Sequence, residues 1–187
     1  MNSVTILKYL LENKEEQFTI NQISKTLNIN YRIAHTQIKL LETEKIIKIK
    51  KAGNSLLCSL TNNFNEKIYL AEHLRRSQLS KDKDFQQIIN RYNNAKQNYI
   101  LLLFGSFAKN KQTKHSDIDL LAITHNPKEI EEITKLIPKA IHLTTVSYQE
   151  FLYMKNSNEV SVGKEAIKNN IILIGIEEYY RLIKNDE

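Results

Sequence analysis

Residues 104–121 read FGSFAKNKQTKHSDIDLL, and this stretch decides how the second half of the chain folds. The apolar run from Tyr99 to Phe104 just before Gly105 is typical of a buried strand, and Ile118 to Ile123 predicts a second strand. Side chains two residues apart on a strand point to the same face. We therefore expect Asp117 and Asp119 to project together, while Ile118 turns into the core.

The paired aspartates predict a site for a hard divalent cation. Two adjacent carboxylates repel each other, and bound Mg²⁺ removes that cost because it prefers carboxylate oxygen and bridges readily to phosphate. Upstream, Gly105 lets the backbone approach a ligand closely, and Ser106 adds a hydroxyl. A helix expected to begin near Phe107 would aim free N–H groups at an anion. A triphosphate could lie between the Gly-Ser turn and the metal.

This arrangement resembles the nucleotidyltransferase superfamily that includes DNA polymerase β, in particular its minimal, single-domain prokaryotic branch. The matching pattern is Gly-Ser after a hydrophobic residue, ten further residues and then Asp-x-Asp, and the resemblance covers about residues 84–183. It implies that Asp117 and Asp119 are catalytic and hold Mg²⁺ or Mn²⁺. It also implies a nucleotide site, whose expected residues are Gly105, Ser106, Lys109 and Ser116. The metals would activate a hydroxyl that attacks the α-phosphate and releases pyrophosphate.

The chain departs from this family pattern at two places. Lys109-Asn110 replaces the usual Arg-Gly, which keeps the charge but loses the bidentate fork, while Asn tolerates a left-handed backbone. The strand expected at 140–146 lacks the third carboxylate of active relatives. His142 could take that place, and because Mg²⁺ prefers oxygen the activity would then favour Mn²⁺. Glu150 is nearest in sequence, but its spacing from Ser147 predicts a capping box.

The first 61 residues show a different pattern, made of three helices and a hairpin. Helical spacing covers residues 3–13, 19–27 and 31–43, and Thr19 and Gln22 form a capping-box signature at the start of the second helix. Two strand-like runs, 46–51 and 55–60, flank Gly53-Asn54, which is a typical hairpin turn. This order resembles the winged helix-turn-helix family, with residues 31–43 as the recognition helix.

The resemblance to winged helix-turn-helix proteins implies duplex DNA as a partner. With Ala34, Ile38 and Leu41 buried, the outward side of the recognition helix would face the major groove. Arg32 is the candidate for a guanine contact, and the lysines suit phosphates. The expected DNA-binding residues are Tyr31, Arg32, His35, Thr36, Lys39, Lys48, Lys50 and Lys51. The alternative is a protein-binding module whose lysines are only solvated.

Charge and periodicity together predict an α+β chain of two domains. The expected boundaries are 1–61 for the winged helix-turn-helix, 62–83 for a helical linker, and 84–187 for a small mixed-sheet α/β nucleotidyltransferase domain. The net charge of +6 is uneven, because residues 1–61 carry +4, residues 62–98 carry +3 and residues 99–187 carry −1. The basic excess thus belongs to the N-terminal half, as a polyanion partner would favour. Cys58 is the only cysteine and is expected to be buried.

Two functions remain open from the sequence. The first is a DNA-binding enzyme that transfers a nucleoside monophosphate, AMP from ATP, to an unidentified acceptor. Its resemblance to antitoxins that modify a partner toxin, often a HEPN-type ribonuclease, makes a protein acceptor plausible. The second is a transcriptional regulator whose degenerate nucleotidyltransferase domain senses nucleotide or binds a partner. No apolar run could span a bilayer, so no membrane partner and a cytoplasmic location are expected; a homodimer is left open.

Overall fold

The computed structural model describes residues 2–113, 116–157 and 161–184. The chain divides into two compact units, Met1–Leu74 and Arg75–Glu187. None of the helices in the described ranges has the length and apolar character that a membrane span requires. Each unit is built around its own sheet, and the two are considered separately.

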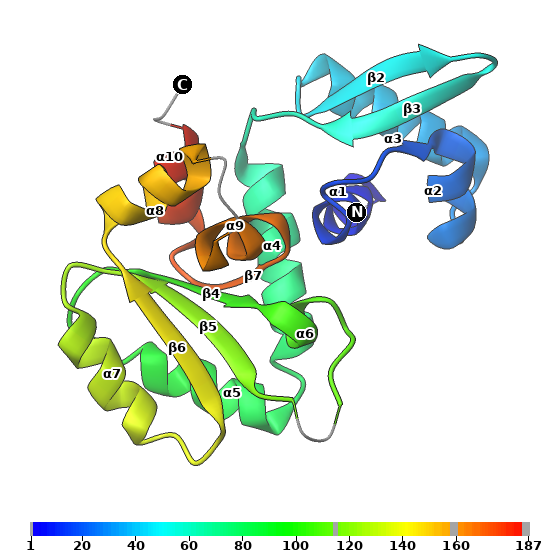
Figure 1. Cartoon of the computed structure of the whole chain (residues 1–187). Helices are drawn as coiled ribbons and strands as arrows, with labels where there is room; N and C mark the ends of the chain where they lie inside the picture. The colour runs from blue at the N-terminus through cyan, green and yellow to red at the C-terminus, as the bar shows by residue number, and fades with distance from the viewer. Residues whose placement is uncertain (1, 114–115, 158–160, 185–187) are drawn as a thin grey trace. The chain divides into compact units, whose positions relative to one another are not determined.

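The N-terminal unit has three helices and a β-hairpin in the order expected of a winged helix-turn-helix. Its elements are, in order, α1 (Asn2–Glu12), β1 (Phe18–Thr19), α2 (Ile20–Thr26), α3 (Tyr31–Thr43), β2 (Ile47–Ala52) and β3 (Ser55–Leu60). The strands form an antiparallel sheet in the order β1-β3-β2, and β2 and β3 make the wing (Figure 1). The sequence pattern did not predict β1, because two residues are too few to show a strand period.

Local signals and a shared core explain why these helices form. Thr19 and Gln22 make both hydrogen bonds of the predicted capping box at the start of α2. Ala34, Ile38 and Leu41 of α3 are fully buried, as their spacing predicted. Cys58 of β3 is also buried, and burial raises the pKa of its thiol to about 11. The thiol is therefore protonated at neutral pH and serves as a small packing group.

Two helices lead into the second sheet. The first, α4 (Glu66–Leu79), contains the point at which the two units divide. The second, α5 (Lys83–Tyr92), begins at Asp82, whose side chain accepts a hydrogen bond from the N–H of Asp84. Within the C-terminal unit, Arg75 of α4 donates to the carbonyl of Asn170 at 2.5 Å, and Arg76 donates to the carbonyl of Leu173 at 3.0 Å. The last turn of α4 is thus fixed to the segment around the final strand.

The C-terminal unit has a four-stranded mixed sheet in the order β6-β5-β4-β7. Its strands are β4 (Ile100–Phe104), β5 (Ile118–Ile123), β6 (Ile141–Val146) and β7 (Ile171–Ile174). The central pair β4 and β5 is antiparallel, β5 and β6 run parallel, and β7 is antiparallel to β4. The remaining helices are α6 (Gly105–Ala108), α7 (Pro127–Lys135), α8 (Tyr148–Asn156), α9 (Val162–Lys168) and α10 (Ile176–Lys184).

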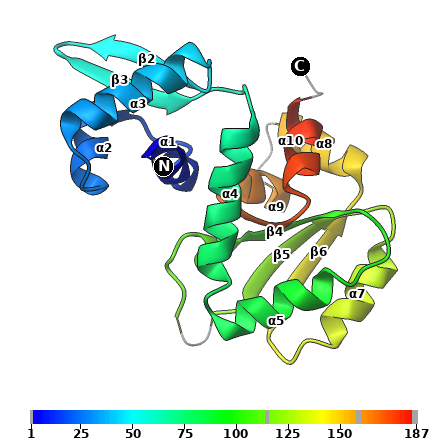
Figure 2. The same ribbon diagram turned by 180° about the vertical axis from the view of Figure 1, so that it is seen from behind.

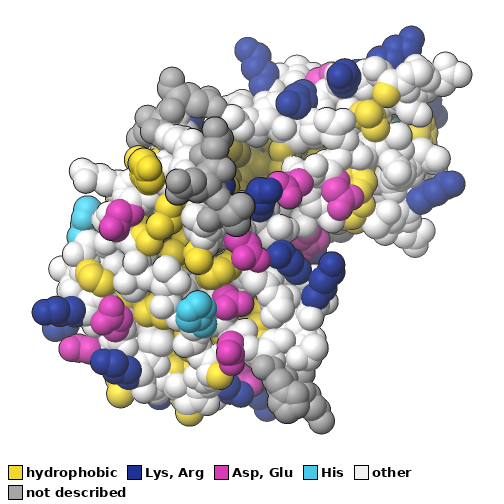
Figure 3. Space-filling view, in the orientation of Figure 1, with side chains coloured by type: hydrophobic (Ala, Val, Ile, Leu, Met, Phe, Trp, Pro, Cys, Tyr) yellow, Lys and Arg dark blue, Asp and Glu magenta, His cyan; other side chains and the backbone are white. Residues whose placement is uncertain are grey.

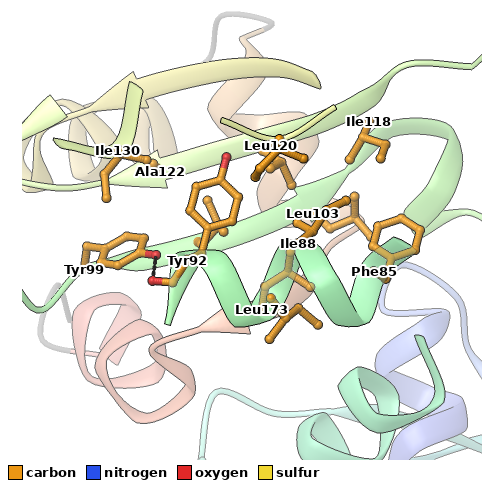
Figure 4. Close-up of a cluster of buried hydrophobic side chains, with 13 residues drawn as sticks. Phe85, Ile88, Tyr92, Tyr99, Leu103, Ile118, Leu120, Ala122, Ile130 and Leu173 are labelled. Atoms are coloured by element: carbon orange, nitrogen blue, oxygen red, sulfur yellow. Dashed lines mark hydrogen bonds between the residues drawn. The ribbon is translucent and has the colours of Figure 1, made fainter. Parts of the chain in front are cut away.

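Helices cover both faces of this sheet. Figures 1 and 2 show α5 and α7 on one face and α8, α9 and α10 on the other. Ile118, Leu120 and Ala122 of β5 belong to the core on the α5 side, where they meet side chains such as Phe85 and Tyr92 (Figure 4). This confirms that Ile118 and Leu120 face the core. Strand alternation then sends Asp119 to the opposite face.

Candidate functional site

The two halves of the Gly-Ser and Asp-x-Asp pattern meet through the pairing of β4 with β5. In that antiparallel register, Phe104 lies opposite Asp119. Gly105 follows at the end of β4 and starts α6 with a φ of +69°. α6 is a single turn of four residues, beginning two residues before the helix expected near Phe107. The turn therefore starts at the glycine itself, directly beside β5.

Gly105 and Asp119 approach so closely that a side chain at residue 105 would have to displace the Asp119 carboxylate. A Cβ on residue 105 would overlap Oδ2 of Asp119 and lie 3.0 Å from its Cγ. The positive φ also disfavours any residue with a side chain. The carboxylate of Asp119 thus rests over the backbone of the Gly-Ser turn. Gly105 therefore allows the Asp119 side chain to lie close to its backbone, whether or not a ligand is bound.

The loop after α6 keeps the backbone turn that the Lys109-Asn110 replacement put in question. Asn110 has a φ of +52°, so it adopts the left-handed conformation in place of the usual glycine. The N–H of Lys111 donates to the carbonyl of Ser106 at 2.9 Å and closes the turn. Ser106 is half-buried, and its hydroxyl has no hydrogen-bond partner within the described ranges.

Lys109 is engaged by a residue that the sequence pattern did not connect with it. Its Nζ lies 2.9 Å from Oε1 of Glu165 on α9, and the two side chains are 35% and 48% exposed. An ion pair this exposed is weak, with a typical strength of about 0–1 kcal/mol. This ion pair can therefore be broken at little cost. The contact brings α9, on the Asp119 face of the sheet, to the Gly-Ser end of the motif.

Ser116 has a structural partner in the loop before β5. Its hydroxyl oxygen accepts a hydrogen bond from the N–H of Thr113 at 2.9 Å and lies 3.2 Å from the Thr113 hydroxyl. These bonds shape the approach to Asp117, so Ser116 has a role that needs no nucleotide. His115, which was considered as a substrate contact, lies outside the described residues.

β6 places a histidine where the family pattern has a carboxylate. In the parallel pairing of β5 with β6, Asp119 lies opposite His142, and Leu121 lies opposite Thr144. Nδ1 of His142 is 3.4 Å from Oδ1 of Asp119, and its side chain is 67% exposed. Leu121 is fully buried. Of the two polar residues on this side of the strand, His142 is therefore the one beside the aspartate pair.

Glu150 performs the structural role that its spacing predicted. Its carboxylate accepts a hydrogen bond from the N–H of Ser147 at 2.7 Å, and the Ser147 hydroxyl accepts one from the N–H of Glu150. This capping box begins α8 and lowers the pKa of the Glu150 carboxyl, chiefly through the backbone hydrogen bond from Ser147. Glu150 is thus committed to the helix start, and β6 contributes no carboxylate of its own.

The carboxylate oxygens at the site are ligands that suit a divalent cation, although the described side chains do not form a complete ligand set. Asp117 is exposed and Asp119 is half-buried, so both carboxylates can be reached from solvent. Among the described residues, no three side chains of His, Cys, Asp or Glu are arranged to hold a metal ion. Asp119 on β5 and Asp117 just before that strand remain the carboxylate oxygens that such a cation requires. The cation would complete its shell with water and phosphate oxygen.

The N-terminal unit exposes most of the residues predicted to bind DNA. Figure 3 shows Lys and Arg side chains projecting from this unit. Tyr31, Arg32 and Lys39 of α3 are exposed, whereas His35 is half-buried. The Thr36 hydroxyl donates to the carbonyl of Arg32 at 2.9 Å. The wing lysines Lys48, Lys50 and Lys51 are all exposed.

Two features of the α3 surface were not anticipated. Nζ of Lys39 forms an ion pair with Glu42 at 2.8 Å, which reduces the positive charge on this part of the helix. Ile33 and Leu40 are each 45% exposed, so the outer surface also carries apolar groups. Arg32 and the wing lysines therefore carry most of the positive charge of the predicted surface, because the charge of Lys39 is offset by Glu42.

The C-terminal geometry defines a nucleotidyltransferase fold, and a comparison with protein families agrees. The family described as "Polymerase beta, Nucleotidyltransferase" matches residues 86–179, which is half of the chain. The chain belongs to this family. The matched range contains the Gly-Ser turn, the aspartate pair and β6.

Comparison with solved structures gives only a distant similarity. Structures of ZitR from Lactococcus lactis align with 48% of this chain at 23% identity for a single-site mutant and 21% for a double mutant in its apo form, with TM-scores of 0.35 and 0.33. The alignments cover 59% and 69% of those chains, so the chain spans about three fifths of the first. Similarity at this level is too low to indicate a shared function. No curated protein matches the chain significantly.

Proposed function

We propose that this protein is a DNA-binding nucleotidyltransferase that transfers a nucleoside monophosphate, AMP from ATP, to an unidentified acceptor, for which a protein hydroxyl is one candidate. The observation that carries the proposal is that the carboxylate of Asp119 lies against the backbone of Gly105. It joins a phosphate-binding turn to a cation-binding carboxylate in one place. A purely structural strand and loop would need neither the bare glycine nor the exposed pair of aspartates.

Each residue of the motif has a distinct task in this proposal. The N–H groups of the Gly105-Ser106 turn and the Ser106 hydroxyl bind phosphate oxygens, and Lys109 exchanges Glu165 for a phosphate. Asp117 and Asp119 would hold the divalent cation. Such a cation, when bound, neutralises charge on the triphosphate and favours ionisation of the attacking hydroxyl. Ser116 keeps Asp117 at the correct end of β5 through its bonds to Thr113.

The N-terminal unit supplies the second part of the proposed function. Its winged helix-turn-helix would place α3 in the major groove, with Arg32 near the base edges and the wing lysines near phosphates. The net charge of +4 on residues 1–61 supports this, because it favours a polyanion partner for this unit. DNA binding would then locate the enzyme at a particular site. An antitoxin-like pairing with a toxin fits the same arrangement.

A second candidate function is favoured by β6. With His142 in place of an acidic residue, the domain could bind a nucleotide without transferring it, and the protein would then act as a nucleotide-sensing regulator. The two candidates differ in one product. An enzyme leaves a labelled nucleoside monophosphate on its acceptor, whereas a sensor leaves none.

The test is a transfer assay with the full chain. We expect α-labelled ATP, supplied with Mn²⁺ or Mg²⁺ and lysate of the source cells, to label a protein band, and we expect less label from CTP, GTP or UTP. Asp119→Asn should abolish the labelling. Asp84→Asn is the matched control, because Asp84 is a surface carboxylate of the same unit that pairs with Lys139, and it should retain full activity. Nucleotide-dependent stabilisation without any labelled product would instead establish the sensor.

A further inference from the structure

Asp119 and His142 form a pair that ordinary hydrogen bonding explains poorly. Their Nδ1 and Oδ1 atoms are 3.4 Å apart, whereas an N–H···O hydrogen bond is typically about 2.7–3.2 Å long. The His142 side chain is 67% exposed, so it is not held there by packing.

The same separation suits two ligands of one metal ion. Protein nitrogen and oxygen ligands lie about 2.0–2.2 Å from a transition metal, so two such donors are about 3.0 Å apart at a right angle and about 3.4 Å apart at a tetrahedral angle. The observed 3.4 Å falls in this range without any movement of the backbone. The strand register fixes it, because Asp119 and His142 are direct neighbours across β5 and β6.

We propose that Asp119 and His142 jointly bind a divalent transition metal, so that the protein binds Mn²⁺ in preference to Mg²⁺. The inference rests on the proposed function for the place of the cation and adds its identity. First-row transition ions accept imidazole nitrogen more readily than Mg²⁺, which selects oxygen, and among them Mn²⁺ is the ion that also suits carboxylate and water. Asp117, two residues before Asp119, is exposed and offers a second carboxylate. Replacing the usual acidic residue by His142 thus changes the metal that the site selects.

The experiment measures binding of the metal alone to the full chain, without nucleotide. Bound Mn²⁺ is followed by the loss of the free-ion signal in electron paramagnetic resonance, and Mg²⁺ affinity is obtained by competition. We expect wild-type protein to bind Mn²⁺ at least about 10-fold more tightly than Mg²⁺. Loss of a ligand should cost at least as much as loss of a residue that orients one, which is about 10–100-fold in affinity. His142→Ala should therefore weaken Mn²⁺ binding by about that factor while changing Mg²⁺ binding little.

Two further variants make the result specific. His142→Asp restores an oxygen ligand, so it should raise Mg²⁺ affinity and reduce the preference for Mn²⁺. His125→Ala is the matched control, because His125 is an exposed histidine of the same unit that stacks on Tyr148 after the other end of β5. It should leave both affinities unchanged. Because His142 is exposed, all variants should melt at the wild-type temperature when no metal is present.

A spectroscopic measurement tests the nitrogen ligand directly. Co²⁺ bound to wild-type protein should show a visible absorption band that His142→Ala shifts or removes and His125→Ala keeps. The proposal is overturned if wild-type protein does not bind Mn²⁺, or if His142→Ala keeps the wild-type ratio of Mn²⁺ to Mg²⁺ affinity. Neither result depends on nucleotidyl transfer. Conversely, normal metal selectivity without a labelled product would overturn only the proposed function.

Discussion

Asp119 is the residue on which the geometry of the candidate site converges. It lies across from Phe104 on one neighbouring strand and from His142 on the other, and its carboxylate covers Gly105. A central position in the sheet gives it a fixed backbone, while the side chain remains half-buried and reachable. Asp117, before the strand begins, lacks these neighbours. We infer that the fixed backbone of Asp119 defines the position of the site, whereas the Asp117 side chain would adjust its position when a cation binds.

The first residue-scale prediction concerns Gly105→Ala. The added methyl would collide with the Asp119 carboxylate and would also force alanine into a left-handed conformation. Left-handed backbone costs about 1–2 kcal/mol and overpacking about 1–3 kcal/mol, so unfolding in urea should show a loss of about 2–5 kcal/mol. Thermal stabilisation by ATP with Mn²⁺ should disappear as well, because the carboxylate is displaced from the turn.

Gly53→Ala is the matched control for this substitution. Gly53 also has a positive φ, +59°, but a Cβ there would meet no atom within 4 Å. Its loss of stability should be the backbone cost alone, about 1–2 kcal/mol. Adding Asp119→Ala to Gly105→Ala should recover part of the lost stability, since contacting residues are not additive. Equal losses for the two glycines would show that the carboxylate does not rest on Gly105.

At the scale of elements, sequence patterns succeeded where the deciding interactions are local. The capping boxes of α2 and α8 and the bounds of β5 were predicted, because capping residues and apolar runs are read within a few positions. β1 was missed because its only strand signal is its pairing with β3 across about 40 residues of chain. The expected helix at Phe107 is one turn, since the loop that follows folds back on Ser106.

Contacts between elements account for what the sequence could not predict at the site. Lys109 and Glu165 are 56 positions apart, and no periodicity relates them. Alternation along β6 placed His142 and Thr144 on the same side, but only the register with β5 shows that Thr144 lies beside buried Leu121. The polar side of β6 is therefore divided, because His142 lies at the candidate site while Thr144 lies next to a core residue. The candidate residues were predictable from the motif, whereas their partners required the fold.

The recognition helix and the wing carry the element-scale prediction. If α3 reads bases, Arg32→Ala should cost about 1–3 kcal/mol on a preferred duplex and relax the sequence preference. Lys50→Ala should weaken all duplexes alike and lower the slope of log affinity against log salt by about 1. The preferred duplex is selected from a random pool with the full chain, and affinity is measured by fluorescence anisotropy at several salt concentrations.

Lys184→Ala provides the charge control for the DNA experiment. Lys184 is an exposed lysine at the end of α10, in the other unit, so its removal changes net charge without changing the proposed surface. It should leave the salt dependence unaltered. An affinity that does not depend on salt, or equal effects of Arg32→Ala on preferred and random duplexes, would indicate that α3 does not read sequence.

At the scale of the whole molecule, the two units carry the same net charge of +3 but present different candidate sites. Within them, residues 1–61 carry +4, while the segment 99–187 that carries the Asp-x-Asp motif has a net charge of −1. A polyanion is therefore attracted more strongly to residues 1–61 than to the segment that holds the aspartates. Each unit has its own sheet and core, which predicts that each ligand stabilises one unit and leaves the other as it was.

The last prediction is that thermal unfolding of the full chain shows two transitions that ligands move separately. A ligand at 100 times its Kd stabilises the unit that binds it by about 2.7 kcal/mol, which for a domain of this size raises Tm by on the order of 10 °C. ATP with Mn²⁺ should raise only the transition of the C-terminal unit, and Asp117→Asn with Asp119→Asn should abolish that shift. A preferred DNA duplex should raise only the other transition, and Arg32→Ala should reduce that shift. Differential scanning calorimetry resolves both effects in one sample. A single transition that both ligands raise equally would show that the units unfold as one, and the separation of DNA binding from nucleotidyl transfer would then have to be abandoned.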